Sequence, residues 1–163
     1  MKKNNKQLDI VFLLDRSGSM SNCVSDTIGG YNSYLHEQKK NKNSLVTTIL
    51  FDDKYEVLHD RKDITKIKDL TNKEYFVRGC TALNDAIGKT ITTLESKNPE
   101  SVLFIITTDG LENASREYRK EDIRKLISKH DDWEFLYIGA NIDSYTEGSS
   151  LGIKTDNIAT YEQ

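Results

Sequence analysis

The sequence predicts an α/β domain in which helices cover both faces of an open, doubly wound and mostly parallel sheet. Two mostly apolar runs, residues 8–14 and 101–108, have the composition of strands buried on both faces, and each is followed by an aspartate. Apolar residues at helical spacing follow the first run, and another such pattern precedes the second. Because strand and helix patterns alternate along the chain, a doubly wound sheet is the architecture they favour.

The segment between the two runs predicts one helix and one hairpin. A helix is expected over about 21–39, with apolar residues at Val24, Ile28, Tyr31 and Leu35. Residues 45–51 and 55–59 are separated by only three residues, which is too short for a crossover. They should therefore pair as an antiparallel hairpin whose second strand lies at the sheet edge. Residues 60–78 are polar and predict a surface connection with about one helical turn.

The second half of the chain continues the alternation. A helix is expected over residues 82–94, before the second apolar run. After that run we expect a helix that is capped by Ser115 and carries Ile123, Leu126 and Ile127. A buried strand from Trp133 to Ile138 and a turn at Gly139 to Asn141 should follow. The last elements expected are a short helix, capped by Asp143 and stopped by Gly152, and a brief strand from Asn157 to Thr160.

Length and charge narrow the function classes. The chain has 163 residues, enough for one domain with a sizeable core. Charged residues make up 30% and the net charge is −3, so no basic field is present to hold nucleic acid by phosphate neutralisation. Residues 1–7 predict a flexible basic tail, and the apolar segment after it is too short for a secretion signal or a membrane span. A cytoplasmic protein is expected.

The loop after the first apolar run carries oxygen side chains at alternate positions. Asp15, Ser17 and Ser19 are two residues apart, and Gly18 allows a tight bend between the serines. Three such oxygens can converge on one point, and Mg²⁺ takes six oxygen ligands at about 2.1 Å. The same string also suits an N-cap and turn cluster before a helix. Taken alone, the loop leaves both interpretations open.

Two further oxygen side chains are expected at the same edge of the sheet. Thr81 precedes the helix of residues 82–94, where its hydroxyl would act as a helix cap or as a loop ligand. Asp109 follows the second apolar run directly. In open parallel sheets, ligands bind beyond the carboxyl ends of the strands. Asp15, Thr81 and Asp109 should therefore lie at one edge.

Together these residues resemble the von Willebrand factor A (vWA) domain family. Its metal-ion-dependent adhesion site (MIDAS) has the pattern Asp-x-Ser-x-Ser, then Thr, then Asp. Residues 15–20, 79–83 and 107–110 match the three elements in the family's order. The resemblance extends from Leu8 to about Thr160. It implies a Rossmann-like sheet with one antiparallel edge strand, the same fold that the patterns predict.

The resemblance also implies a ligand set and a partner. Ser17, Ser19 and Thr81 would offer hydroxyls to Mg²⁺, Mn²⁺ or Ca²⁺, and Asp15 and Asp109 would act directly or through water. The remaining coordination position would take a Glu or Asp carboxylate from a partner protein, because a carboxylate is a hard anionic ligand. The predicted function is a divalent-metal-dependent protein-binding module and not an enzyme, with no nucleic acid or membrane as partner.

The domain limits follow from the same resemblance. Residues 8–163 are expected to form a single vWA domain. Domains of this family normally close with one more helix than the sequence after Thr160 allows, so we expect either a shortened chain or a minimal form of the domain.

Two other functions use the same site residues. One is a magnesium-dependent hydrolase or phosphoryl-transfer enzyme, and the other is a scaffold with a vestigial site. The enzyme is disfavoured because the sequence has no Gly-x-Ser-x-Gly or Gly-x-x-x-x-Gly-Lys motif. It is also disfavoured because His36, His59 and His130 are not predicted beside the serines. The vestigial scaffold is disfavoured because no ligand position has been lost.

The loops around the site predict a rim that would select the partner. These rim residues are Arg16, Met20, Asn22, Tyr75, Arg78, Cys80, Glu112 and Asn113. Cys23 and Cys80 are too few for a disulfide framework and lack the Cys-x-x-Cys spacing, so both are expected to be reduced. Their expected place near the metal edge leaves a thiol pair open as an alternative.

Overall fold

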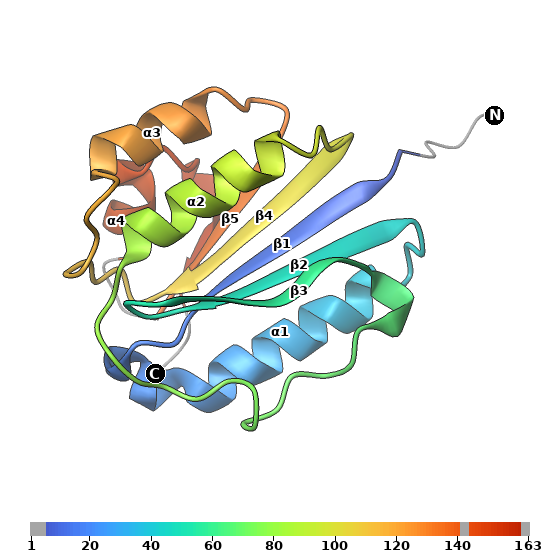
Figure 1. Cartoon of the computed structure of the whole chain (residues 1–163), viewed down its shortest axis with the longest axis horizontal. Coiled ribbons are helices and arrows are strands. Elements are labelled where there is room, and N and C mark those ends of the chain that lie inside the picture. Colours follow the sequence, from blue (N-terminus) through green and yellow to red (C-terminus); the bar gives the residue numbers. More distant parts are fainter. Residues whose placement is uncertain (1–5, 141–143, 161–163) are drawn as a thin grey trace.

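A six-stranded sheet organises the protein in the computed structural model, which describes residues 6–140 and 144–160 (Figure 1). The strand order is β3-β2-β1-β4-β5-β6, and only β2 and β3 pair antiparallel. The strands are β1 (Leu8–Asp15), β2 (Ser44–Phe51), β3 (Tyr55–Asp63), β4 (Ser101–Thr108), β5 (Glu134–Gly139) and β6 (Ile158–Thr160). The predicted fold class is therefore confirmed, with the antiparallel strand at the edge.

Helices pack on both faces of this sheet, as Figure 1 shows. Helix α1 (Val24–Gln38) covers one face, and α2 (Leu83–Glu95) and α3 (Lys120–Ser128) cover the other. The short helix α4 (Ser144–Ser150) contacts β5 and β6. The described part of the chain also contains the 3-10 segments η1 (Gly18–Cys23), η2 (Ile64–Lys66) and η3 (Thr155–Asn157). Within the described residues, no helix is long and apolar enough to cross a membrane.

The central strand β1 contributes to two separate cores because its side chains alternate between the faces. Ile10 and Phe12 belong to the core under α1, whereas Val11 and Leu13 belong to the core under α2 and α3. All four are nearly inaccessible to solvent. Because both faces of β1 are buried, its sequence is an almost continuous apolar run. The same burial holds the end of β1 rigidly in the middle of the sheet.

The structure corrects the interpretation of residues 60–78. Strand β3 continues to Asp63, and Ile64, Ile67, Leu70 and Tyr75 are buried in the core under α1. The expected single helical turn is present as η2, but the segment packs as a core element and is not only a surface connection. The four buried residues are irregularly spaced in a mostly polar segment, so no periodic pattern revealed this packing.

Two details of the helices also differ from the predictions. The first turn of the helix expected from about residue 21 is the 3-10 segment η1, and the α-helix begins at Val24. Helix α3 begins at Lys120 with Arg119 as its N-cap, so Ser115 does not cap it. The proposed Asp143 cap, the turn residue Asn141, residues 1–5 of the tail and residues 161–163 lie outside the described residues.

Candidate metal centre

Asp15 lies at the carboxyl end of β1 and is held by three hydrogen bonds. One carboxylate oxygen, Oδ1, accepts the backbone N–H of Ser17 at 2.8 Å, and Oδ2 accepts the hydroxyl of Thr108 at 2.7 Å. The hydroxyl of Tyr75 donates to the main-chain carbonyl of Asp15. Asp15 is fully buried. Its carboxylate is therefore held in one orientation at the middle of the edge.

Ser17 and Ser19 place two hydroxyls together next to this carboxylate. Their Oγ atoms are 3.2 Å apart, with Ser17 buried and Ser19 exposed. Neighbouring ligands of an octahedral ion with bonds of about 2.1 Å are separated by about 3 Å. The spacing of the two hydroxyls therefore fits two adjacent positions around a small divalent cation.

Thr81 connects the other two segments of the candidate site. Its backbone N–H donates to Oδ1 of Asn113 at 2.8 Å, and its carbonyl accepts the backbone N–H groups of Asn113 and Ala114, both at 2.9 Å. Two residues earlier, the carbonyl of Gly79 accepts the N–H of Gly18 at 3.0 Å. Thr81 is buried. It precedes α2 without capping it, since the N-cap position is Ala82 and has no side-chain hydrogen bond.

Asp109 follows β4 in a tight turn. Its Oδ1 accepts the backbone N–H of Leu111 at 3.0 Å, and the residue is 7% exposed. Gly110 has a φ of 82°, a conformation that side-chain-bearing residues rarely adopt. A methyl group on Gly110 would also overlap the carboxylate of Glu147 from α4. The turn that carries Asp109 therefore depends on a glycine.

Burial makes the charge of Asp15 costly in the protein alone. Desolvation raises the pKa of Asp15 from its ordinary value of 3.8 to about 6, although the hydrogen bonds from Ser17 and Thr108 act in the opposite direction. The negative charge of Asp109 raises it further. A cation bound beside Asp15 would stabilise its ionised carboxylate.

The donor set is suited to a hard cation. It contains carboxylate and hydroxyl oxygens and no sulfur or imidazole ligand, so it fits Mg²⁺, Mn²⁺ or Ca²⁺ and not a soft metal. Across residues 6–140 and 144–160, no cluster of three or more Asp, Glu, His and Cys side chains is placed to hold a metal ion. A cation at the candidate site would therefore rely on hydroxyls and water in addition to its two carboxylates.

The loop after Asp109 caps α2, which the sequence did not reveal. Glu112 accepts the backbone N–H of Asn84 at 2.7 Å, and Ser115 Oγ accepts that of Asp85 at 2.9 Å. Asp85 in turn accepts backbone N–H groups of residues 116, 117 and 118. Ser115 thus caps a helix, but α2 and not α3. The predicted rim members Glu112 and Asn113 are structural supports of this loop, although both are exposed.

Three other rim predictions are wrong because the side chains are buried. Arg16, Met20 and Tyr75 are at most 1% exposed. The guanidinium of Arg16 bonds to the carbonyl of Phe76 at 3.0 Å and to Glu56 at 2.6 Å, and lies 4.2 Å from the ring centre of Phe76. The rim residues that are exposed are Asn22, Arg78, Cys80, Glu112 and Asn113. Cys23 and Cys80 are not joined in a disulfide; the first is buried and the second is exposed.

Sequence reasoning placed Thr108 in the third motif and Asn113 in the rim, but it missed that Thr108 holds Asp15 and that Asn113 holds Thr81. Thr108 lies inside the third motif, immediately before Asp109, and its hydroxyl would otherwise be an unpaired polar group in a buried strand. The expected burial of this hydroxyl was the signal in the sequence that Thr108 needs a hydrogen-bond partner. Asn113 had no such signal, because its pairing with Thr81 joins residues 32 positions apart.

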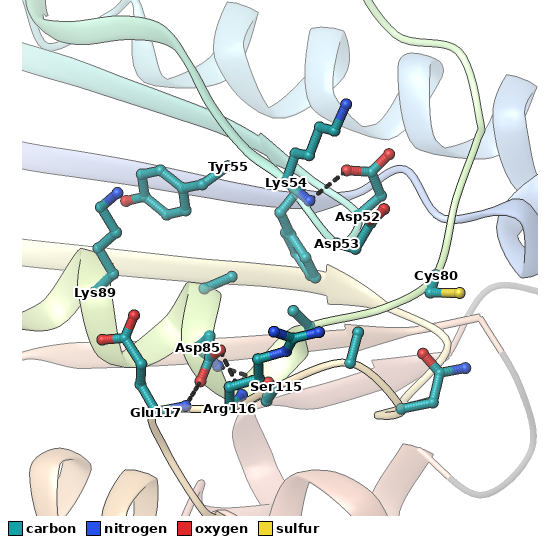
Figure 2. Close-up of a pocket in the computed structure, with 15 residues that line it drawn as sticks. Asp52, Asp53, Lys54, Tyr55, Cys80, Asp85, Lys89, Ser115, Arg116 and Glu117 are labelled. Carbon is teal, nitrogen blue, oxygen red and sulfur yellow. Dashed lines mark hydrogen bonds between the residues drawn. The ribbon is translucent and has the colours of Figure 1, made fainter.

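A polar groove of about 690 Å³ opens beside the candidate site, between the β2–β3 turn, α2 and the loop after β4 (Figure 2). None of the five predicted ligands lines this groove. Cys80 and Ala82, which flank Thr81 in the sequence, do line it. Its charged side chains have both signs: Asp52, Asp53, Lys54, Asp85, Lys89, Arg116 and Glu117. Asp52 is paired with Arg78, and Asp85 is occupied by the backbone bonds drawn in Figure 2.

Solved structures share this fold. A von Willebrand factor type A structure from Catenulispora acidiphila is 13% identical with a TM-score of 0.69, and the match covers 97% of this chain and 39% of that chain. The ArnB paralog VWA2 from Sulfolobus acidocaldarius is 18% identical (TM-score 0.65, 96% and 41% covered). The pilus adhesin SpaC from Lactobacillus rhamnosus GG, in an open conformation, is 14% identical (TM-score 0.76, 99% and 28% covered).

These likenesses show a vWA-like fold. The chain spans less than half the length of each of the three proteins. Neither a family model nor a curated protein sequence matches the chain significantly.

Proposed function

We propose that this protein is a divalent-metal-dependent protein-binding module with a MIDAS-type site. Asp15, Ser17, Ser19, Thr81 and Asp109 would hold Mg²⁺, or Mn²⁺ or Ca²⁺ in its place, and a Glu or Asp of a partner protein would complete the shell. The observation that carries the proposal is the pair of serine hydroxyls 3.2 Å apart next to the buried, hydrogen-bonded carboxylate of Asp15.

The charge of the site supports an anionic partner. A divalent cation, when bound, supplies a positive centre for a hard anionic ligand. The chain's own residues hold Asp15 and Thr81 in position through Thr108 and Asn113, so little rearrangement of these groups is needed. Because the ligand hydroxyls are neutral, one further carboxylate is electrostatically acceptable at the cation.

Binding is favoured over hydrolysis by the positions of the histidines. His36 pairs with Asp69, His59 Nδ1 is 2.9 Å from Thr48 Oγ1, and His130 pairs with Glu95. Each is thus engaged away from Ser17 and Ser19, and no imidazole is offered as a general base to either serine. These positions support our proposal that the site serves binding and not catalysis.

The proposal is tested by metal binding to wild type and to Asp15→Asn, which keeps the shape of the side chain and removes its charge. Calorimetric titration with Mn²⁺ and thermal melts in Mg²⁺ or EDTA should show binding and stabilisation for wild type only. A ligand at a hundredfold excess over its dissociation constant stabilises the folded state by about 2.7 kcal/mol. Equal responses of both proteins, or no response of wild type, would reject the site and favour the vestigial scaffold.

A further inference from the structure

Large exposed apolar side chains gather near the candidate metal centre. Among residues 6–140 and 144–160, the large apolar side chains that remain exposed are Val57 (51%), Phe76 (45%), Leu111 (48%) and Tyr145 (51%). Val57 lies on the edge strand β3. The other three, which we call the apolar rim, belong to the connection before α2, the connection after β4 and the start of α4. Those segments meet at the carboxyl edge of the sheet.

Two members of the apolar rim are tied directly to the candidate metal loops. The ring of Phe76 stacks on the buried guanidinium of Arg16, the residue between Asp15 and Ser17. The backbone N–H of Leu111 donates to the carboxylate of Asp109 at 3.0 Å. The Phe76 ring is therefore held beside the site by its own contact, and the backbone of Leu111 is fixed in the Asp109 turn.

The third member is placed by the packing of α4. Ser144, the residue before Tyr145, packs against Gly139 at the end of β5, where an added methyl group would overlap its hydroxyl. Glu147, in the same helix turn, packs against Gly110 in the Asp109 turn. Tyr145 is thus carried on a helix turn anchored to the loop next to the metal centre.

A small buried cluster lies beneath the same edge. It consists of Met20, Cys23 and Ala140, with Val77 packed against it. These residues come from the connections after β1, before α2 and after β5. Because three connections share this cluster, they are packed together at this edge of the sheet.

We propose that the partner's acidic residue lies in a short segment with large apolar side chains one or two positions away, which pack on Phe76, Leu111 and Tyr145. This inference rests on the proposed function and specifies its partner. An apolar contact that excludes water around a metal-bound carboxylate strengthens the electrostatic attraction, because the local dielectric falls. The groove beside α2 carries charges of both signs, so it does not favour a partner of one charge. We therefore infer that the apolar rim contributes more than this groove to the choice of partner.

The test is selection of a random peptide library displayed on phage. The library is bound to the immobilised protein in Mn²⁺ and eluted with EDTA, and enriched peptides are sequenced. The most enriched peptide is then synthesised, and its dissociation constant is measured by fluorescence polarisation. The expected sequences contain Glu or Asp with a large apolar residue within two positions.

Point variants test whether the selected peptide contacts the apolar rim. Phe76→Ser, Leu111→Ser and Tyr145→Ser should each weaken the peptide about tenfold, which corresponds to about 1.4 kcal/mol. Val57→Ser is the matched control, because Val57 is equally exposed but lies on β3, and it should stay within twofold of wild type. The stabilisation by Mn²⁺ should be the same in all four variants, which shows that the fold and the site remain intact.

The outcomes separate this inference from the proposed function. EDTA-eluted acidic peptides with polar neighbours, or rim variants that bind like the control, would overturn the inference and leave the metal-dependent function standing. An absence of EDTA-eluted acidic peptides would reject the function and the inference with it. A metal-dependent dimer in sedimentation, lost in the triple rim variant, would assign the rim to a second copy and also overturn the inference.

Discussion

The hydroxyl of Thr108 donates to the Asp15 carboxylate at 2.7 Å and so joins the ends of the neighbouring parallel strands β1 and β4. The two residues are 93 positions apart in the sequence. This bond orients one carboxylate oxygen of Asp15 and leaves the other to the Ser17 N–H. The candidate metal centre therefore depends on a residue that is not itself a proposed ligand.

Replacing Thr108 by valine should weaken metal binding without removing a ligand. Valine keeps the volume but leaves Asp15 Oδ2 without its donor, and a hydrogen bond to a charged group contributes about 1.5–3 kcal/mol. We expect Mn²⁺ affinity at pH 7 to fall by about tenfold in calorimetric titration. Thr108→Ser is the control and should retain most of the affinity. Unchanged affinity in the valine variant would mean that Asp15 needs no orientation by β4.

The metal-free protein should lose stability as pH rises from about 4 to 6. The folded-state pKa of Asp15 is raised from 3.8 to about 6, so the folded protein binds this proton more tightly than the unfolded chain. The contribution is therefore complete below about pH 4 and is lost as pH passes through about 6. Two pKa units correspond to about 3 kcal/mol at most.

Urea denaturation in EDTA, compared between wild type and Asp15→Asn, isolates this contribution. The difference in unfolding free energy between the two proteins should change in favour of Asp15→Asn as pH rises. Saturating Mg²⁺ should reverse the trend for wild type, because the cation binds the ionised carboxylate and competes with the proton. A pH-independent difference in EDTA would show that Asp15 has an ordinary pKa.

The hydroxyl of Thr81 should matter for metal affinity and little for folding. Thr81→Val keeps the β-branched shape and all the backbone bonds to Asn113 and Ala114, and α2 is capped by Glu112 and Ser115 instead. We expect loss of Mn²⁺ binding with a change in unfolding free energy of about 1 kcal/mol or less. Thr81→Ser should bind nearly as wild type. A destabilised valine variant with normal Mn²⁺ affinity would assign the hydroxyl to structure alone.

Gly110→Ala should destabilise the turn that carries Asp109. Alanine at a φ of 82° is strained, and its methyl group would overlap the Glu147 carboxylate. We expect a loss of about 1–3 kcal/mol in chemical denaturation together with weaker metal binding. Gly29→Ala, in an exposed and unobstructed position of α1, is the control and should stabilise by up to about 1 kcal/mol. Equal stabilities of the two variants would contradict the conformation of the turn.

Local patterns were sufficient to predict the fold class. Strands β1 and β4 are apolar because both of their faces are buried, and such a run is visible without knowing its neighbours. The three residues between β2 and β3 excluded a crossover, which placed the antiparallel strand correctly at the edge. The strand ends placed the candidate oxygen side chains at one edge, and the resemblance to the vWA family then implied the proposed ligand set.

Properties that depend on distant packing were decided only by the tertiary structure. Arg16 and Tyr75 looked like solvated loop residues, yet Arg16 is buried by Phe76 and Glu56 and Tyr75 by its contact with the Asp15 carbonyl. The capping of α2 by Ser115 likewise joins segments 30 residues apart.

The sequence by itself determined the order of strands and helices and the oxygen-rich character of the site, because hydrophobic period and residue chemistry are local properties. The tertiary structure decided that the Thr108 hydroxyl holds Asp15 and that the Asn113 side chain holds Thr81, and which apolar side chains remain exposed near them. Those features depend on contacts between residues far apart in the chain, and no local pattern records such contacts.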